Sequence, residues 1–206
     1  MGYGRTYLSG IQPAVADVDR FVASTNMVVG TYGAPAAAAM PEANTARKVT
    51  ITRTFAGAAD VAGTITVTGT DLAGQTITEI LTPSAVDVTL VTGTKWFRTV
   101  TSVFGTGTPG WSIVAGNDTI TVGCAADAII AEGSGVLHGI QINTTANGVI
   151  TISDAGGTIA ILPANVAVGT FYLWEVNWTG WLRVVMAAAS DITVLHSGSL
   201  PSTYSK

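Results

Sequence analysis

Alternation of apolar and polar residues with a period of two is the feature that most constrains this chain. In the segment 48–54, Val49 and Ile51 share one side of an extended chain and threonines fill the other, and the segment 63–69 repeats the pattern. Strand side chains point alternately to the two sides, whereas apolar residues of a helix recur every three or four positions. Helical periodicity is nearly absent. The sequence therefore predicts an all-β protein.

Strand-like segments separated by turn-forming residues run through both halves of the chain. Beyond the two above, strands are predicted at 76–81, 86–92, 96–104, 111–115 and 119–123, and then at 136–143, 149–153, 158–162, 171–178, 182–187 and 191–196. The stretch from Asp71 to Gly74 predicts a type I turn closed by glycine, and Asn147-Gly148 predicts a hairpin turn. Short strands at such regular spacing are typical of sandwiches and barrels.

The alternation weakens at 127–135, where Asp127 and Glu132 precede a Gly-Ser-Gly sequence. We therefore expect two small antiparallel β-sandwich domains, jelly-roll or Ig-like, joined by a linker. The expected boundaries are 17–126 for the first domain, 127–135 for the linker, 136–198 for the second domain and 199–206 for a C-terminal tail.

The first 16 residues fit neither domain. Tyr3, Tyr7 and Leu8 stand among glycines there, and Pro13 ends the stretch. One interpretation is a loose terminus. The other is an extended N-terminal arm, residues 1–16, that becomes ordered against a neighbouring subunit, because a purely solvated tail carries fewer aromatic residues.

Charged residues are scarce, at 11% of 206 residues against about 25% in ordinary soluble domains, while apolar residues reach 48%. The low charge favours a surface partly covered by other subunits. The net charge is −4 and the longest basic cluster is Arg47-Lys48, so we expect no nucleic-acid partner. The longest small-apolar run, 34–40, contains Pro35 and is too short to span a bilayer. We expect no membrane partner, no secretory signal and synthesis in the cytosol.

The sequence offers only weak matches to motifs for cofactor binding, metal binding or catalysis. Residues 105–110 match the dinucleotide pattern G-x-G-x-x-G, but Pro109 and the strand-like segment from Trp111 follow instead of a helix. With Cys124 as the single cysteine and His138 and His196 as the only histidines, we expect no metal site.

Cys124 with either histidine could form a nucleophile and base, but a buried apolar cysteine and hydrogen-bonded structural histidines are the preferred interpretations. A glycosidase needs two carboxyl groups that face each other. The aspartates at 60, 71, 87, 118, 154 and 191 mostly fall at turns or strand ends. We expect no enzyme activity and no cofactor.

The segment 171–178 is unusually aromatic. One side would carry Tyr172, Trp174 and Trp178, while the other also holds large apolar groups, and Trp181 follows. Either one side is core and the other half-exposed, or one side is a subunit interface, where Trp and Tyr are enriched. The interface candidates are Tyr3, Tyr7, Leu8, Tyr172, Trp174, Trp178 and Trp181.

Several of these segments resemble virion proteins of tailed bacteriophages. Residues 47–52, 63–71, 75–79 and 92–103 resemble a β-sandwich segment with the pattern R-x-V-T-I-T, G-T-[IV]-T-V-T-G-T-D, G-x-x-[IL]-T-E and T-G-x-K-x-F. The second half is similar to a small sandwich of phage head-decoration, neck and fibre-attachment proteins, through residues 136–140, 150–154 and 191–194. The resemblance implies a structural role and brings no catalytic residues.

Taken together, these features lead us to expect a capsid decoration or cement protein on the outer capsid surface of the virion. Its partners would be the major capsid protein or another virion protein, and it would form a homo-oligomer, a trimer or dimer. The alternatives are a neck, tail or head-fibre adaptor and a carbohydrate-binding module that stacks sugars on Trp174, Trp178 or Trp181. An enzyme is a third class.

Overall fold

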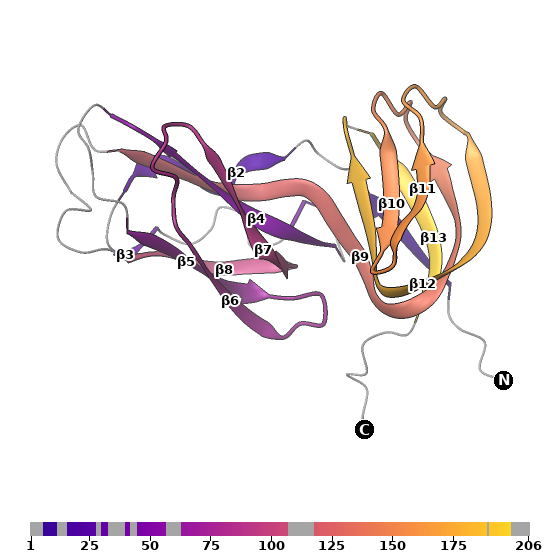
Figure 1. Cartoon of the computed structure of the whole chain (residues 1–206), viewed down its shortest axis with the longest axis horizontal. Helices are drawn as coiled ribbons and strands as arrows, with labels where there is room; N and C mark the ends of the chain where they lie inside the picture. Colours follow the sequence, from indigo (N-terminus) through magenta and orange to yellow (C-terminus); the bar gives the residue numbers. More distant parts are fainter. Residues whose placement is uncertain are drawn as a thin grey trace. The chain divides into compact units, whose positions relative to one another are not determined.

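The computed structural model describes residues 6–11, 16–27, 30–32, 40–41, 45–56, 63–106, 118–188 and 190–198. These residues form strands and no helix, and the strands belong to two sheets (Figure 1). The all-β expectation is therefore confirmed. The described part of the chain contains no helix that is long and apolar enough to cross a membrane.

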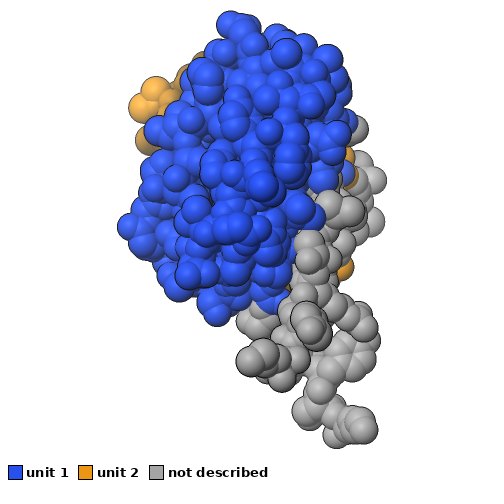
Figure 2. Space-filling model, turned by 90° about the vertical axis from the view of Figure 1, so that its right-hand side faces the viewer, with its two compact units in different colours: residues 1–15, 41–46, 126–206 blue, residues 16–40, 47–125 orange. Residues whose placement is uncertain are grey.

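The chain divides into two compact units. Unit 1 contains residues 1–15, 41–46 and 126–206, and unit 2 contains residues 16–40 and 47–125 (Figure 2). Each unit has its own cluster of buried apolar residues. The long strand β9 (Thr119–Ile142) supplies residues to both.

Unit 2 is built from two antiparallel groups of strands. In one, β4 pairs with β7 and with β9, and β9 also pairs with β2; these are β2 (Asp17–Asn26), β4 (Ala46–Thr54) and β7 (Leu90–Phe97). The other is a sheet in the order β3-β8-β5-β6, with β3 (Gly30–Thr31), β8 (Thr99–Thr106), β5 (Thr64–Thr70) and β6 (Thr76–Leu81). Val49 and Ile51 of β4 share one core with Ile65 and Val67 of β5. The alternating residues of both groups therefore face each other, as in a sandwich.

Unit 1 contains strands in the order β1-β13-β9-β12-β10-β11. They are β1 (Thr6–Ile11), β13 (Ile192–Gly198), β12 (Phe171–Met186), β10 (Ile150–Asp154) and β11 (Gly157–Leu162), with the second part of β9. The core contains Leu137 and Ile140 of β9, Ile152 of β10 and Val194 of β13. Successive inward residues of each strand thus meet in one apolar cluster.

The predicted turn between the strands of the first hairpin is confirmed. The Gly74 amide donates to the Asp71 carbonyl at 3.1 Å, and the Gln75 amide donates to the Asp71 carboxylate at 2.8 Å. Gly74 has a φ of 81°, a left-handed conformation that glycine adopts without steric cost. This turn joins β5 and β6 in an unbroken antiparallel register.

The expectation of an N-terminal arm needs correction. Residues 6–11 form β1, which pairs antiparallel with β13 from Thr6 opposite Ser197 to Ile11 opposite Ile192. The segment is an edge strand in a sheet of its own chain, and not an arm that becomes ordered only against a neighbouring subunit. Ser9 and Gly10 hide the alternation, while the backbone hydrogen bonds that decide the place of the segment depend little on side chains.

The segment expected as a linker, 127–135, lies inside β9. Gly133 has a φ of 106° and is paired with Gly180, whose φ is 77°. A Cβ on Gly135 would lie 1.8 Å from the carbonyl oxygen of Ser197. The glycines therefore allow paired strands to approach each other closely and to distort locally, and they do not mark a loop. For the same reason, the predicted strands 171–178 and 182–187 are one strand, β12.

Two further expectations differ from the structure. Asn147-Gly148 does not close a hairpin between β9 and β10, because β12 lies between these strands in the sheet. A Cβ on Gly148 would lie 2.5 Å from the Ala188 nitrogen, so the glycine permits a close crossing. Residues 86–89 precede β7 instead of extending it. The predicted strand 111–115, the predicted tail 199–206 and Tyr3 lie outside the described residues.

Candidate functional site

An exposed apolar loop stands out on unit 2. It consists of residues 86–89 together with Leu90, the first residue of β7, and we call residues 86–90 the apolar loop. Phe55, the residue after β4, lies beside it. Val86 is 65% exposed, Val88 is 63% exposed and Leu90 is 48% exposed. Three large apolar side chains so close together are a feature of contact surfaces rather than of ordinary exposed loops.

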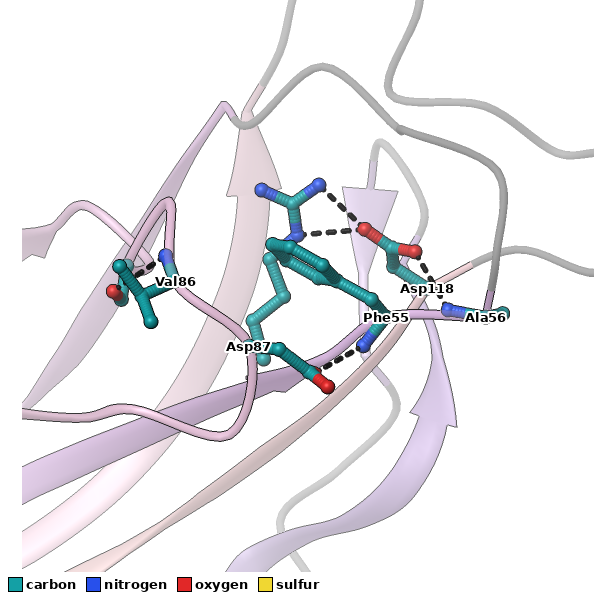
Figure 3. Close-up of polar contacts among 7 residues, drawn as sticks. Phe55, Ala56, Val86, Asp87 and Asp118 are labelled. Carbon is teal, nitrogen blue, oxygen red and sulfur yellow. Dashed lines mark hydrogen bonds and ion pairs between the residues drawn. The ribbon is translucent and has the colours of Figure 1, made fainter.

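Four hydrogen bonds of its backbone and side chains hold the apolar loop. The Val88 amide donates to the Arg53 carbonyl at 2.9 Å. The Phe55 amide donates to the Asp87 carboxylate at 2.7 Å (Figure 3). The Val86 amide donates to the Ser84 hydroxyl at 2.9 Å, and the Thr89 hydroxyl contacts the Asp87 carbonyl at 3.4 Å. The loop therefore presents its apolar side chains from a fixed backbone.

Val88 adopts a φ of 51°, which is rare for a β-branched residue because its side chain crowds the backbone there. Such a conformation costs on the order of 1–3 kcal/mol and persists only when surrounding contacts hold it. The strained residue is itself 63% exposed, so the conformation places an apolar side chain on the surface, and strained positions of this kind cluster at functional sites.

A buried ion pair fixes the base of this region. Arg53 Nε donates to Asp118 at 2.7 Å, with the two side chains 5% and 0% exposed. The second Asp118 oxygen accepts the Ala56 amide at 2.9 Å, and the Arg53 guanidinium lies 4.4 Å from the Phe55 ring centroid. In Figure 3 the Asp118 carboxylate points toward Ala56. Because both charges are compensated inside the unit, the end of β4 is anchored beside the apolar loop.

The aromatic strand β12 of unit 1 has one inward and one outward side in its first part. Tyr172 and Trp174 are half-buried against the core, with their rings stacked at 5.6 Å. On the opposite side, Phe171 is 51% exposed and Leu173 is 68% exposed. The outward apolar pair is the more exposed side of this part of β12, and the interface role of Tyr172 and Trp174 stays a prediction.

Trp178 needs correction as an interface candidate, because it is 1% exposed and belongs to the core of unit 1. Its ring cannot stack on a sugar or a partner while it is buried. Trp181 is half-buried. Tyr7 and Leu8 lie in β1, and only their backbone is described, so their interface role stays a prediction, as does that of Tyr3.

Cys124 is buried in unit 2, and burial raises the pKa of its thiol, against the weaker opposing effect of Arg47. A thiol with a raised pKa is a poor nucleophile, which agrees with the apolar interpretation. In the described part of the chain, no group of three or more His, Cys, Asp or Glu side chains is placed to hold a metal ion.

The two histidines have different surroundings in unit 1. His196 is 4% exposed, and burial lowers its pKa to about 4, with a smaller contribution from His138. His138 is hydrogen-bonded, as expected: Nδ1 lies 3.0 Å from both carboxylate oxygens of Glu175, and Nε2 lies 3.1 Å from the Ser197 hydroxyl. Sequence reasoning missed this grouping because the three residues are far apart in the chain.

Sequence reasoning also missed the apolar loop. The alternation of Val86, Val88 and Leu90 imitates a strand. The available signal was Ser84, whose side chain accepts the Val86 amide two residues along the chain. Comparisons of the chain with protein-family models, with curated proteins and with solved structures found no match.

Proposed function

We propose that this chain is a structural subunit of a tailed-bacteriophage particle, a decoration protein that binds the outer head shell and stabilises it by packing against capsid subunits. The observation that carries the proposal is the apolar loop, whose exposed valines are fixed by hydrogen bonds and a buried ion pair. A preformed apolar contact loses little conformational freedom on binding, so more of its buried area contributes to affinity.

Two sequence features support the choice of a phage shell as the partner. The segments 47–52, 63–71, 75–79 and 92–103 resemble virion β-sandwich segments, and they supply β4 to β8 of unit 2, the unit that carries the apolar loop. The 11% content of charged residues suits a protein whose surface is partly covered after assembly. A neck, tail or fibre adaptor uses the same kind of contact at lower copy number.

The first test is the copy number of the chain relative to the major capsid protein in purified particles, measured by quantitative mass spectrometry. We expect a ratio near the number of capsid subunits or a simple fraction of it. A few copies to a few tens per particle would place the chain in the neck, tail or fibres instead. Absence from particles would overturn the structural role.

The second test addresses the apolar loop with the double variant Val86→Ser/Val88→Asn. Asparagine tolerates a positive φ better than valine, so the variant should fold at least as stably while its apolar contact area is removed. We expect binding to shells that lack the protein to weaken by at least about tenfold, equivalent to ~1.4 kcal/mol. The matched control is Ile80→Thr, which changes a residue that is 65% exposed on β6 and should bind normally. Equal binding by the double variant would exclude the loop as the contact.

A further inference from the structure

Glu175, His138 and Ser197 form one hydrogen-bonded chain across three neighbouring strands of unit 1. His138 lies in β9, which pairs with β12 on one side and with β13 on the other. Its Nδ1 lies 3.0 Å from each Glu175 carboxylate oxygen, and its Nε2 lies 3.1 Å from the Ser197 Oγ. One imidazole therefore joins a carboxylate to a hydroxyl through its two different nitrogens.

Register shifts in the pairing of β9 with β12 and of β9 with β13 create this arrangement. Leu173 pairs with Gly139 and Val176 pairs with Leu137, so β12 has two residues where β9 has only His138. On the other side, Leu195 pairs with Gly139 and His196 with Leu137, so His138 has no residue opposite it in β13. Bulges of this kind re-aim side chains and are frequent beside active sites. Here they bring Glu175 and Ser197 to the same imidazole.

The order of contacts is the one that activates a serine. A carboxylate at Nδ1 keeps the proton on that nitrogen and orients the ring, which leaves the Nε2 lone pair to accept the serine proton. Glu175 is 66% exposed and His138 is 22% exposed, while Ser197 is half-buried. A small molecule can therefore approach the chain of hydrogen bonds from solvent.

Apolar side chains lie beside the hydrogen-bonded chain of Glu175, His138 and Ser197. Phe171 and Leu173 are exposed on β12, within two to four residues of Glu175. The Phe171 Cζ lies 3.0 Å from where a Cβ on Gly139, the neighbour of His138, would be. The Phe171 ring thus covers the backbone next to the imidazole and offers an apolar support for an acyl chain.

We propose that Ser197 is a nucleophile that accepts acyl groups from small uncharged esters with short apolar acyl chains. Ser197 Oγ bonds to the ester carbonyl carbon while its proton passes to His138 Nε2. The carbon–oxygen bond of the ester then breaks, and the alcohol leaves with the proton from His138. Water, deprotonated by His138, releases the acid and restores Ser197. Ser197 and His138 are the catalytic residues, and Glu175 is a positioning residue.

The test uses the full chain with p-nitrophenyl butyrate. We expect release of p-nitrophenolate and a butyryl adduct on Ser197, located by peptide mass spectrometry of the wild-type protein. Because a positioned base contributes about 100-fold or more, His138→Gln should lower the rate of acylation by that factor. Ser134→Ala, which changes an exposed serine of β9, should leave the rate unchanged. No adduct on Ser197, or an equal rate in His138→Gln, would overturn the proposal.

The role of Glu175 is tested by comparison of two variants. Glu175→Gln should slow acylation, because the amide cannot match a carboxylate as the acceptor for the Nδ1 proton. Glu175→Asp should recover part of the loss, since it restores a carboxylate. A purely structural role predicts equal rates in both variants when their thermal unfolding temperatures are equal. Equal rates would therefore remove Glu175 from the assignment.

Discussion

At the scale of single residues, His196 makes the folding of unit 1 sensitive to acid. The side chain is 4% exposed, and the Trp178 ring packs against it edge-on at 6.5 Å. Burial lowers its pKa from 6.5 to about 4 in the folded chain. Between these two pH values the unfolded chain binds more protons than the folded chain, so the free energy of unfolding falls as the pH falls.

We therefore expect unit 1 to lose about 3 kcal/mol of stability from this residue as the pH drops from above 6.5 to below 4. Urea unfolding at a series of pH values, followed by tryptophan fluorescence, measures the loss. His196→Leu should have a shallower pH dependence over this range, and Ser134→Ala, which changes an exposed serine of β9, should keep the wild-type dependence. If His196→Leu and wild type lose stability in parallel, the buried histidine is not responsible.

At the scale of elements, a buried glutamate ties β6 to β7 across the two strand groups of unit 2. Glu79 is 8% exposed and accepts the Thr94 amide at 2.6 Å and the Thr94 hydroxyl at 2.9 Å. A Cβ on Gly93 would lie 2.4 Å from Glu79 Oε2. The segments 75–79 and 92–103 thus meet at one contact.

Gly93→Ala should displace the Glu79 carboxylate from its donors and destabilise unit 2 by about 2–3 kcal/mol, since hydrogen bonds to a charged group are worth about 1.5–3 kcal/mol. The measurement is chemical denaturation of the single variants Gly93→Ala and Glu79→Ala and of the double variant. When Glu79→Ala is already present, Gly93→Ala has no carboxylate to displace. Gly93→Ala should therefore lower the free energy of unfolding by less in that background than in the wild-type chain. Additive losses would show that the two residues act separately. Thr76→Ala, an exposed change on β6, serves as the control.

At the scale of the whole molecule, the N-terminus contributes to the sheet of unit 1. β1 pairs with β13 over six positions, so a chain that lacks residues 1–13 loses this pairing. We expect amide protection of β13 against hydrogen exchange to fall by at least about tenfold, equivalent to ~1.4 kcal/mol. Amides of β5 in unit 2 should keep their protection. A deletion that ends before Thr6 is the control, and unchanged protection of β13 would show that β1 adds no stability.

The sequence by itself determined the class of fold and the inward residues of many strands. The period of two marked β4, β5 and β6, and it assigned Val49, Ile51, Ile65 and Val67 to the core correctly, because alternation is a local property of extended chain. The turn from Asp71 to Gly74 was also predictable, since its donors and acceptors lie within five residues.

Only the tertiary structure decided which strands are neighbours, and therefore which residues meet. Gly133 and Gly135 belong to the segment predicted as a linker, but they lie inside β9, where Gly133 pairs with Gly180 of β12 and Gly135 closely approaches the backbone of Ser197. Trp178 and Phe171 belong to the same aromatic segment, yet one is buried and the other exposed. The contact of His138 with Glu175 and Ser197 joins residues 37 and 59 positions apart. Pairing and register across such distances depend on the packing of the whole sheet, which local residue patterns do not encode.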